Sequence, residues 1–179
     1  MNDKYTELII GVGSRPQKIL AAKGREHWSN LTTLDINGDH NPDVVWDLNN
    51  KPFPFEDNSF NEIHAYEVLE HIGTQGDYKA FFEEFSEYWR ILKPGGILFG
   101  TSPSINSPWL WGDPGHTRVI SPQVFTFLSQ QEYTRQVGKT AITDYRFMYK
   151  ADFQIGFQQT QGDTFAYSLV AMKPSRITI

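Results

Sequence analysis

The feature that most constrains the fold is a short apolar run that ends in two closely spaced glycines, from Leu8 to Gly13. Such a run is typical of a buried strand that breaks into a tight turn, because glycine tolerates a positive φ. Two more short strands are expected at residues 31–35 and 44–47, and each ends in an aspartate. In a parallel sheet the carboxyl ends of the strands meet at one edge, where ligands bind. The sequence therefore predicts an α/β sheet with a ligand site at that edge.

The rest of the chain continues the alternation of strands and helices. Apolar residues at helical spacing predict a helix from Tyr78 to Leu92, and further helices are expected over residues 18–27 and after the Ser121-Pro122 pair. Strands are expected at residues 60–66, 97–101, 152–159 and 164–172, the last two joined by a hairpin turn at 161–163. We therefore predict a single domain over residues 1–179, with a mostly parallel sheet and an antiparallel C-terminal edge hairpin.

Composition excludes several classes of protein. The 179 residues include no cysteine, which excludes disulfide scaffolds, iron–sulfur clusters and cysteine-ligated zinc. With 21 acidic and 16 basic residues the net charge is −5, which makes bulk nucleic acid a less favoured partner. No apolar run approaches the length of a membrane span, and the first residues do not resemble a signal peptide. We expect a cytoplasmic protein without a membrane partner.

The acids at the strand ends suggest a nucleotide-like ligand. Asp35 follows Gly11 by 24 residues, a position from which a carboxylate can accept both hydroxyls of a ribose. The dinucleotide fingerprint requires a further glycine where this chain has Pro16, which argues against a nicotinamide or flavin site. Each acid taken singly is also typical of a solvated loop residue or a helix cap.

Several motifs in order resemble the class I S-adenosylmethionine-dependent methyltransferases, in particular the type 11-like group with a minimal Rossmann-like domain. The resemblance covers about residues 6–130 and is carried by residues 9–13, 34–36, 45–48 with 52–63, 67–71 and 90–98. It implies a Rossmann-like three-layer sandwich that binds S-adenosyl-L-methionine. It also implies in-line displacement of the methyl group to an O or N acceptor.

The resemblance assigns the cofactor-binding residues by position. The two glycines of the motif would lie against the amino-acid part of the cofactor. Aspartates and their apolar neighbours would face the ribose and the adenine, and a tyrosine and a glutamate after the fourth predicted strand would face the sulfonium. The residues are Gly11, Gly13, Asp35, Ile36, Asp47, Leu48, Tyr66 and Glu67.

Two positions depart from the family pattern. Many members carry an acid where this chain has Ile9 and a glycine where it has Arg15, and both positions lie near the cofactor's ammonium group, which Glu67 could contact instead. These departures motivate an alternative, a non-catalytic S-adenosylmethionine-binding or regulatory protein. A third hypothesis is an NAD-dependent oxidoreductase.

Two histidines are candidate catalytic bases, His71 and His116. Our primary prediction includes no metal. As an alternative, Glu67, Glu70 and His71 have the i, i+3, i+4 spacing of one helical face, and with His116 they could hold a divalent cation. Some branches of the resembling family use such a set.

The segment 102–118 is a long loop at the end of a predicted strand, and loops of this length are usually functional. We expect Trp109, Trp111 and Arg118 to bind the methyl acceptor. The alternative is that both tryptophans bury themselves to pin the loop. The short stretch before the first strand would leave the cleft open to a large acceptor or to a second subunit, so a homodimer is a further expectation.

Overall fold

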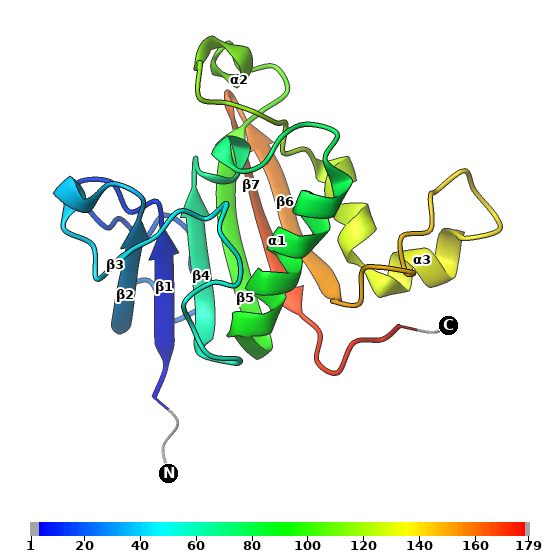
Figure 1. The fold of residues 1–179 in the computed structure, drawn as a ribbon, viewed down its shortest axis with the longest axis horizontal. Coiled ribbons are helices and arrows are strands. Elements are labelled where there is room, and N and C mark those ends of the chain that lie inside the picture. Colours follow the sequence, from blue (N-terminus) through cyan, green and yellow to red (C-terminus); the bar gives the residue numbers. More distant parts are fainter. Residues whose placement is uncertain (1–3, 178–179) are drawn as a thin grey trace.

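In the computed structural model, which describes residues 4–177, the chain forms one seven-stranded sheet in the order β3-β2-β1-β4-β5-β7-β6 (Figure 1). Strand β7 runs antiparallel to both of its neighbours, and the other adjacent pairs are parallel. This confirms the predicted α/β sheet with its C-terminal hairpin. The strands are β1 (Thr6–Ile10), β2 (Asn30–Asp35), β3 (Val44–Val45), β4 (Phe60–Tyr66), β5 (Leu92–Pro103), β6 (Phe153–Gln161) and β7 (Thr164–Ala171).

The main helix is α1 (Tyr78–Ile91), as the apolar spacing predicts. It begins where the Asp77 side chain accepts the N–H of Ala80, at 3.1 Å. The shorter helices are α2 (Trp109–Gly112) and α3 (Gln130–Gln136), with 3₁₀ helices at Gly38–His40, Leu69–His71 and Pro122–Leu128. The helix predicted after Ser121 is thus a 3₁₀ helix, and the Ser121 side chain makes no capping hydrogen bond.

The two faces of the sheet are chemically different. Side chains alternate along a strand, so every second residue of β1 and β4 points to the same face. Leu8, Ile10, Ile63 and Ala65 belong to the apolar core, which includes the buried face of α1. The opposite face of these strands carries Glu7, Glu62 and His64, all fully buried, together with the buried apolar Ile9.

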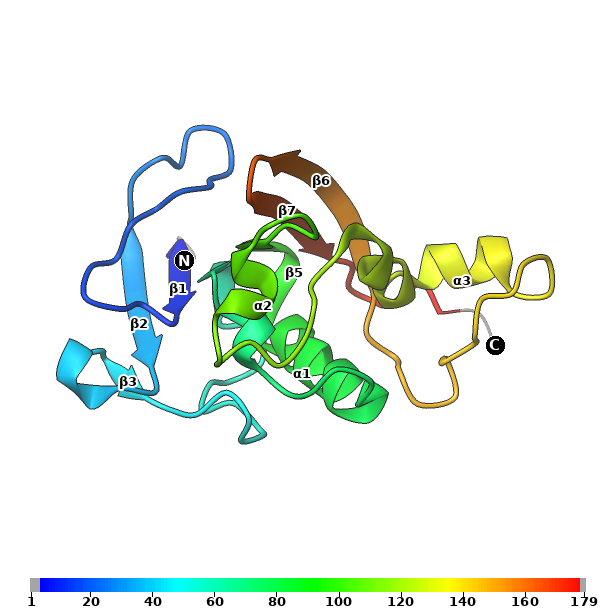
Figure 2. The same ribbon diagram turned by 90° about the horizontal axis from the view of Figure 1, so that it is seen from above.

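The helix predicted over residues 18–27 is absent, and the segment between β1 and β2 is irregular instead. It lies on the opposite side of the sheet from α1 (Figure 2). The Lys18 ammonium pairs there with the carboxylates of Glu7 and Glu62, and its side chain is only 3% exposed. The N–H of Ser29 also donates to Glu7, at 2.6 Å. The buried acids need these partners, and the irregular chain supplies them.

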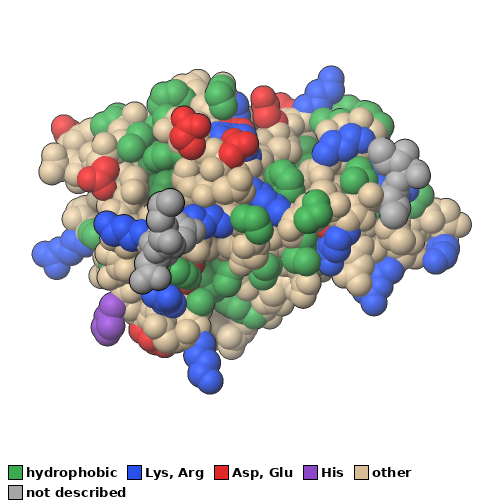
Figure 3. Space-filling model, turned by 90° about the horizontal axis from the view of Figure 1, so that it is seen from below, with side chains coloured by type: hydrophobic (Ala, Val, Ile, Leu, Met, Phe, Trp, Pro, Cys, Tyr) green, Lys and Arg blue, Asp and Glu red, His purple; other side chains and the backbone are tan. Residues whose placement is uncertain are grey.

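Two features of the described residues bear on membranes and nucleic acids: the length of the helices and the distribution of basic side chains. Among residues 4–177, no helix combines the length and the apolar character that crossing a bilayer requires. On the face at the amino ends of the parallel strands, Lys and Arg side chains are spread apart (Figure 3). Among the described residues visible in Figure 3, apolar and acidic side chains lie between many of the basic ones.

Candidate functional site

The first candidate site is a pocket of about 350 Å³ at the carboxyl ends of β1, β2 and β4, which we call the Asp35 pocket. This is the edge at which the sequence places a ligand. The pocket is lined by seven of the predicted cofactor-binding residues, Gly11, Gly13, Asp35, Ile36, Asp47, Leu48 and Glu67.

The same pocket contains His71, which was predicted as a candidate base, and residues that the sequence analysis did not assign to a site: Leu34, His40, Trp46, Asn49, Val68 and Ile72. Some of these carried a usable signal, because Trp46 and Asn49 flank the predicted Asp47-Leu48 pair. His40 carried none, because it reaches the pocket from a turn whose path depends on tertiary structure.

Gly11 allows two turns to approach each other. Its φ is +63°, and a Cβ at this position would lie 2.3 Å from Cγ2 of Val68. Any side chain at this position would have to displace the side chain of Val68. Gly13 also has a positive φ, of +59°, and its N–H donates to Asp35 at 2.9 Å. The glycine motif therefore shapes the pocket floor.

Asp35 is nearly buried and its carboxylate already has protein partners. Oδ1 accepts the N–H of Asn37 at 2.8 Å, and Oδ2 accepts that of Gly13 and lies 3.1 Å from Nδ1 of His40. Burial alone would raise the pKa of Asp35, but these hydrogen bonds outweigh it and lower the pKa below the usual value. Asp35 is therefore an anion with about one of its four acceptor positions free.

Tyr66 does not face this pocket, contrary to the prediction. Its hydroxyl accepts the N–H groups of Ile19 and Leu20, at 3.2 and 3.0 Å, and lies 2.7 Å from Nδ1 of His64. These contacts place Tyr66 on the irregular-segment side of the sheet. It anchors that segment, and burial raises its pKa to about 12.

A second pocket, of about 400 Å³, adjoins the first, and we call it the Trp109 pocket. Glu67 and His71 line both pockets. The remaining walls come from the end of β5, the loop that follows it and the β6–β7 turn, and they are Pro103, Ser107, Trp109, Asp113, His116, Asp163 and Thr164.

Glu67 stands at the shared wall in a strained conformation. Its φ is +55°, which is uncommon for a residue with a side chain and is frequent at functional sites. Its N–H donates to the carbonyl of Thr101 at 2.9 Å, which ties the end of β4 to β5. Burial raises the pKa of the Glu67 carboxyl.

The two histidines lie edge to face, with ring centroids 4.6 Å apart. Nδ1 of His71 lies 3.1 Å from the carbonyl oxygen of Gly115, and Nδ1 of His116 lies 3.1 Å from that of Leu110. A carbonyl oxygen only accepts hydrogen bonds, so Nδ1 carries the proton in each neutral ring. Nε2 of each ring then keeps a lone pair, which can accept a proton or bind a metal.

Glu70 is fully buried beneath these histidines. Its Oε2 accepts the hydroxyl of Ser102 at 2.9 Å, and its Oε1 has no hydrogen-bond partner within the described part of the chain. Burial raises its pKa to about 7. Glu70, His71 and His116 each place one potential ligand atom within 4.8 Å of the others, so these three fit a cation, whereas Glu67 is not part of the group.

The tryptophans of the 102–118 loop are exposed, so the alternative in which both bury themselves is wrong. Trp109 is 64% exposed and lines the second pocket. Trp111 is 67% exposed and does not line it. Only the first therefore lies where an acceptor would contact it.

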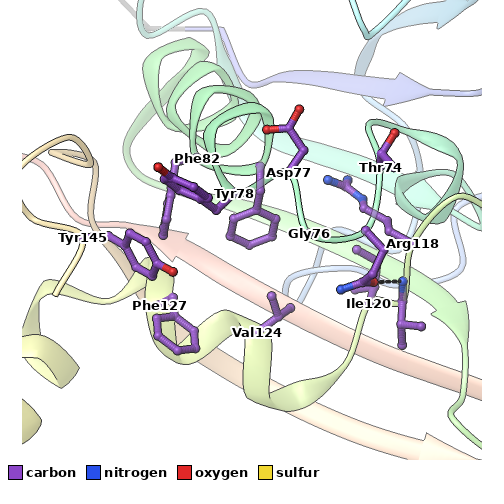
Figure 4. Close-up of a pocket in the computed structure, with 13 residues that line it drawn as sticks. Thr74, Gly76, Asp77, Tyr78, Phe82, Arg118, Ile120, Val124, Phe127 and Tyr145 are labelled. Atoms are coloured by element: carbon purple, nitrogen blue, oxygen red, sulfur yellow. Dashed lines mark hydrogen bonds between the residues drawn. The ribbon is translucent and has the colours of Figure 1, made fainter. Parts of the chain in front are cut away.

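Arg118 does not reach the Trp109 pocket, contrary to the prediction. It is buried, its Nη1 lies 2.7 Å from Oε2 of Glu84, and its Nε donates to the carbonyl of Leu69. It lines instead a separate aromatic pocket between α1 and the 3₁₀ helix Pro122–Leu128, together with Phe82 and Tyr145 (Figure 4). Arg118 is thus a structural cation.

Comparisons with known proteins agree with this geometry. The profile of the family described as "Methyltransferase domain" matches residues 8–100. Among curated proteins, none matches the sequence. A solved SAM-dependent methyltransferase from Archaeoglobus fulgidus is similar, with a TM-score of 0.58 and 15% identity over 93% of this chain and 86% of that chain.

Two further solved structures share the fold. A SAM-dependent methyltransferase from Methanosarcina mazei has a TM-score of 0.54 and 16% identity over 96% of this chain and 94% of that one. The N-methyltransferase NodS from Bradyrhizobium japonicum, in complex with S-adenosyl-L-homocysteine, has a TM-score of 0.54 and 16% identity over 94% and 78%. Because the family profile spans more than half of the sequence, the chain belongs to the methyltransferase domain family, and its cofactor is S-adenosyl-L-methionine.

Proposed function

We propose that this protein is an active methyltransferase that transfers a methyl group from S-adenosylmethionine to an O or N acceptor in the Trp109 pocket. The observation that carries the proposal is the wall shared by the two pockets, formed by Glu67 and His71. A donor in the Asp35 pocket and an acceptor in the Trp109 pocket would meet there. A second pocket beside the donor pocket supports methyl transfer over cofactor binding alone.

The residues that line the Asp35 pocket would hold the cofactor. Asp35 would accept a ribose hydroxyl, and displacement of the His40 side chain, which is 34% exposed, would free a position for the second. Ile36, Asp47 and Leu48 would border the adenine. Gly11 and Gly13 would lie against the amino-acid part, which brings the sulfonium to Glu67.

The residues of the shared wall can support an in-line displacement. Most of the acceleration would come from holding the nucleophile, the methyl carbon and the sulfur in line while excluding water. Nε2 of His71 or of His116 would take the proton that the acceptor loses. The proposed catalytic residues are therefore these two imidazoles.

The first test is calorimetric titration of S-adenosylhomocysteine, with NAD as the control ligand. We expect micromolar binding that weakens by roughly tenfold or more in Asp35→Ala, because charge-assisted hydrogen bonds are lost. Asp39→Ala, which changes an exposed neighbour, should bind normally. Asp35→Asn keeps one side-chain oxygen that can accept a backbone N–H, and it should also bind weakly. This variant distinguishes the loss of contacts to the ligand from unfolding of the protein.

The outcomes separate the three functional hypotheses. Binding of NAD but not of S-adenosylhomocysteine would contradict the proposal and favour an oxidoreductase. Binding of S-adenosylhomocysteine without methyl transfer to any amine or alcohol acceptor would favour the regulatory alternative. We also propose a cytoplasmic location and a homodimer, in which the second subunit covers the open cleft.

A divalent cation is the second candidate component, because Glu70, His71 and His116 fit one. It would stabilise negative charge on an acceptor oxygen, as a Lewis acid does. The primary proposal leaves the imidazoles free as bases, so we expect calorimetry of chelator-treated protein to show no Mn²⁺ binding. Micromolar Mn²⁺ binding that disappears in Glu70→Gln would instead assign these residues as ligands.

A further inference from the structure

The Trp109 pocket has a marked excess of negative charge. Three carboxylates line it, those of Glu67, Asp113 and Asp163, and none of its described lining residues is a lysine or arginine. Arg118, the cation nearest in sequence, is held away from it by Glu84. A concave surface with charge of one sign attracts ligands of the opposite sign and repels those of the same sign.

The same pocket offers an aromatic wall. The indole of Trp109 is largely exposed, and a cation over such a face gains a favourable interaction with the ring quadrupole. An aromatic face beside carboxylates is the combination that recognises ammonium groups. A flat apolar skeleton attached to the ammonium would gain burial against the same indole.

Hydrogen bonds hold these walls together before any ligand arrives. The N–H of Ser104 donates to the carbonyl of Asp163 at 2.7 Å, and the hydroxyl of Ser104 donates to Gly162. The N–H of Ser107 donates to Ser104, and that of Trp109 to the Ser107 hydroxyl. The loop that carries Trp109 is thus fastened to the β6–β7 turn that carries Asp163.

Asp113 is oriented in a similar way. Its Oδ1 accepts the N–H of Gly115 at 2.7 Å, and its Oδ2 lies 3.9 Å from Nε2 of His116. The carboxylate is therefore close to a proposed base. An ammonium near Asp113 could pass its proton to that imidazole, and the resulting imidazolium would be stabilised by the carboxylate.

Methyl transfer to nitrogen suits such a pocket. The nitrogen lone pair forms the new N–CH₃ bond, the S–CH₃ bond breaks, and its electron pair remains on sulfur. Before this step the bound ammonium passes one proton to an imidazole, which frees the lone pair. The positive charge then moves from the sulfonium to the nitrogen, so the product is again an ammonium beside the carboxylates and needs no second base. An anionic acceptor would be repelled by the same carboxylates.

We propose that the methyl acceptor is an amine carried on a flat, mainly apolar skeleton, bound as an ammonium by Glu67, Asp113 and Asp163 with its skeleton against Trp109. This inference rests on the proposed function and names its substrate class. An alcohol of the same shape would gain only the contact with the indole.

Three probes of one shape test the inference: benzylamine, benzyl alcohol and benzoate, each titrated into protein saturated with S-adenosylhomocysteine. We expect benzylamine to bind about tenfold tighter than the alcohol, and benzoate not to bind. The Asp113→Asn/Asp163→Asn double variant should weaken benzylamine about tenfold and leave the alcohol unchanged. Asparagine keeps an oxygen for the N–H of Gly115, and Glu83→Gln, which removes an exposed charge on α1, is the control.

The outcomes distinguish this inference from the proposed function. If S-adenosylhomocysteine binds but the three probes bind equally, or the double variant binds benzylamine normally, the amine assignment is wrong and the methyltransferase proposal stands. If S-adenosylhomocysteine does not bind, both fail. Methylated benzylamine formed from labelled S-adenosylmethionine, with no methylated alcohol, would complete the support.

Discussion

At the residue scale, Gly11 marks the position where the site tolerates the least change. A methyl group there would meet Val68 at 2.3 Å, in a backbone conformation that already disfavours a side chain. We expect Gly11→Ala to lower the free energy of unfolding by about 3 kcal/mol, from strain plus overpacking. It should also abolish binding of S-adenosylhomocysteine.

Gly95 supplies the matched control for this prediction. Its φ is +76°, but a Cβ there meets nothing within 4 Å. Gly95→Ala should therefore show only the backbone cost, about 1 kcal/mol, with normal ligand binding. Urea unfolding and calorimetry measure both effects, and equal losses in the two variants would contradict the role given to Val68.

The positions of some site residues could be predicted from the sequence, and those of others could not. The sequence analysis placed Asp35 and Asp47 in the pocket because both follow strands whose ends share one edge. It misplaced Tyr66, because neighbouring strand residues point to opposite faces and only the local geometry decides which one enters the cleft. It misplaced Arg118 because the partner that buries it, Glu84, lies 34 residues away.

At the scale of elements, the missing helix before β2 has a physical cause. Residues 18–27 contain Gly24, with a φ of +78°, and no apolar stripe that a helix would bury. The face they cover carries Glu7, Glu62 and His64, which need charged and polar partners. The predicted helix therefore does not form, because the segment has to supply charged and polar partners to the buried groups of this sheet face. Only the folded sheet shows that requirement.

Lys18 tests that explanation. Lys18→Met keeps much of the side-chain volume but leaves two buried carboxylates without their ammonium partner, so we expect a loss of about 3 kcal/mol in the free energy of unfolding. Lys23→Met, an exposed change in the same segment, should be nearly neutral. Chemical denaturation of both variants gives the comparison. Similar stabilities would show that the segment does not depend on this ion pair.

At the scale of the whole molecule, the mostly parallel sheet with an antiparallel hairpin at its edge followed from the sequence because each strand is a short apolar run between clear turn signals. The hairpin of β6 and β7 was equally predictable from alternation and its Gly162 turn. The relation between the two pockets was not, because it depends on how the loop after β5 folds back over the end of β4. The wall shared by the two pockets therefore could not be predicted from the sequence alone.

The buried carboxylate of Glu62 and its partners contribute to the stability of the whole molecule in acid. Burial disfavours the charged form of Glu62, but hydrogen bonds from His64, Lys18 and Tyr5 outweigh it and lower its pKa from 4.5 to about 2. A lowered carboxyl pKa stabilises the folded state at pH values above 4.5. That contribution, roughly 3 kcal/mol, disappears as the pH falls toward 2.

Glu62→Gln should remove this dependence, because glutamine does not titrate. We expect the difference in free energy of unfolding between wild type and Glu62→Gln to shrink by about 2 kcal/mol between pH values of roughly 5 and 2.5. Urea unfolding at both pH values measures it, and Glu83→Gln, an exposed change, should keep a constant difference. Parallel curves for wild type and Glu62→Gln would mean that other carboxylates control acid unfolding, and that the irregular segment is held mainly by its apolar contacts.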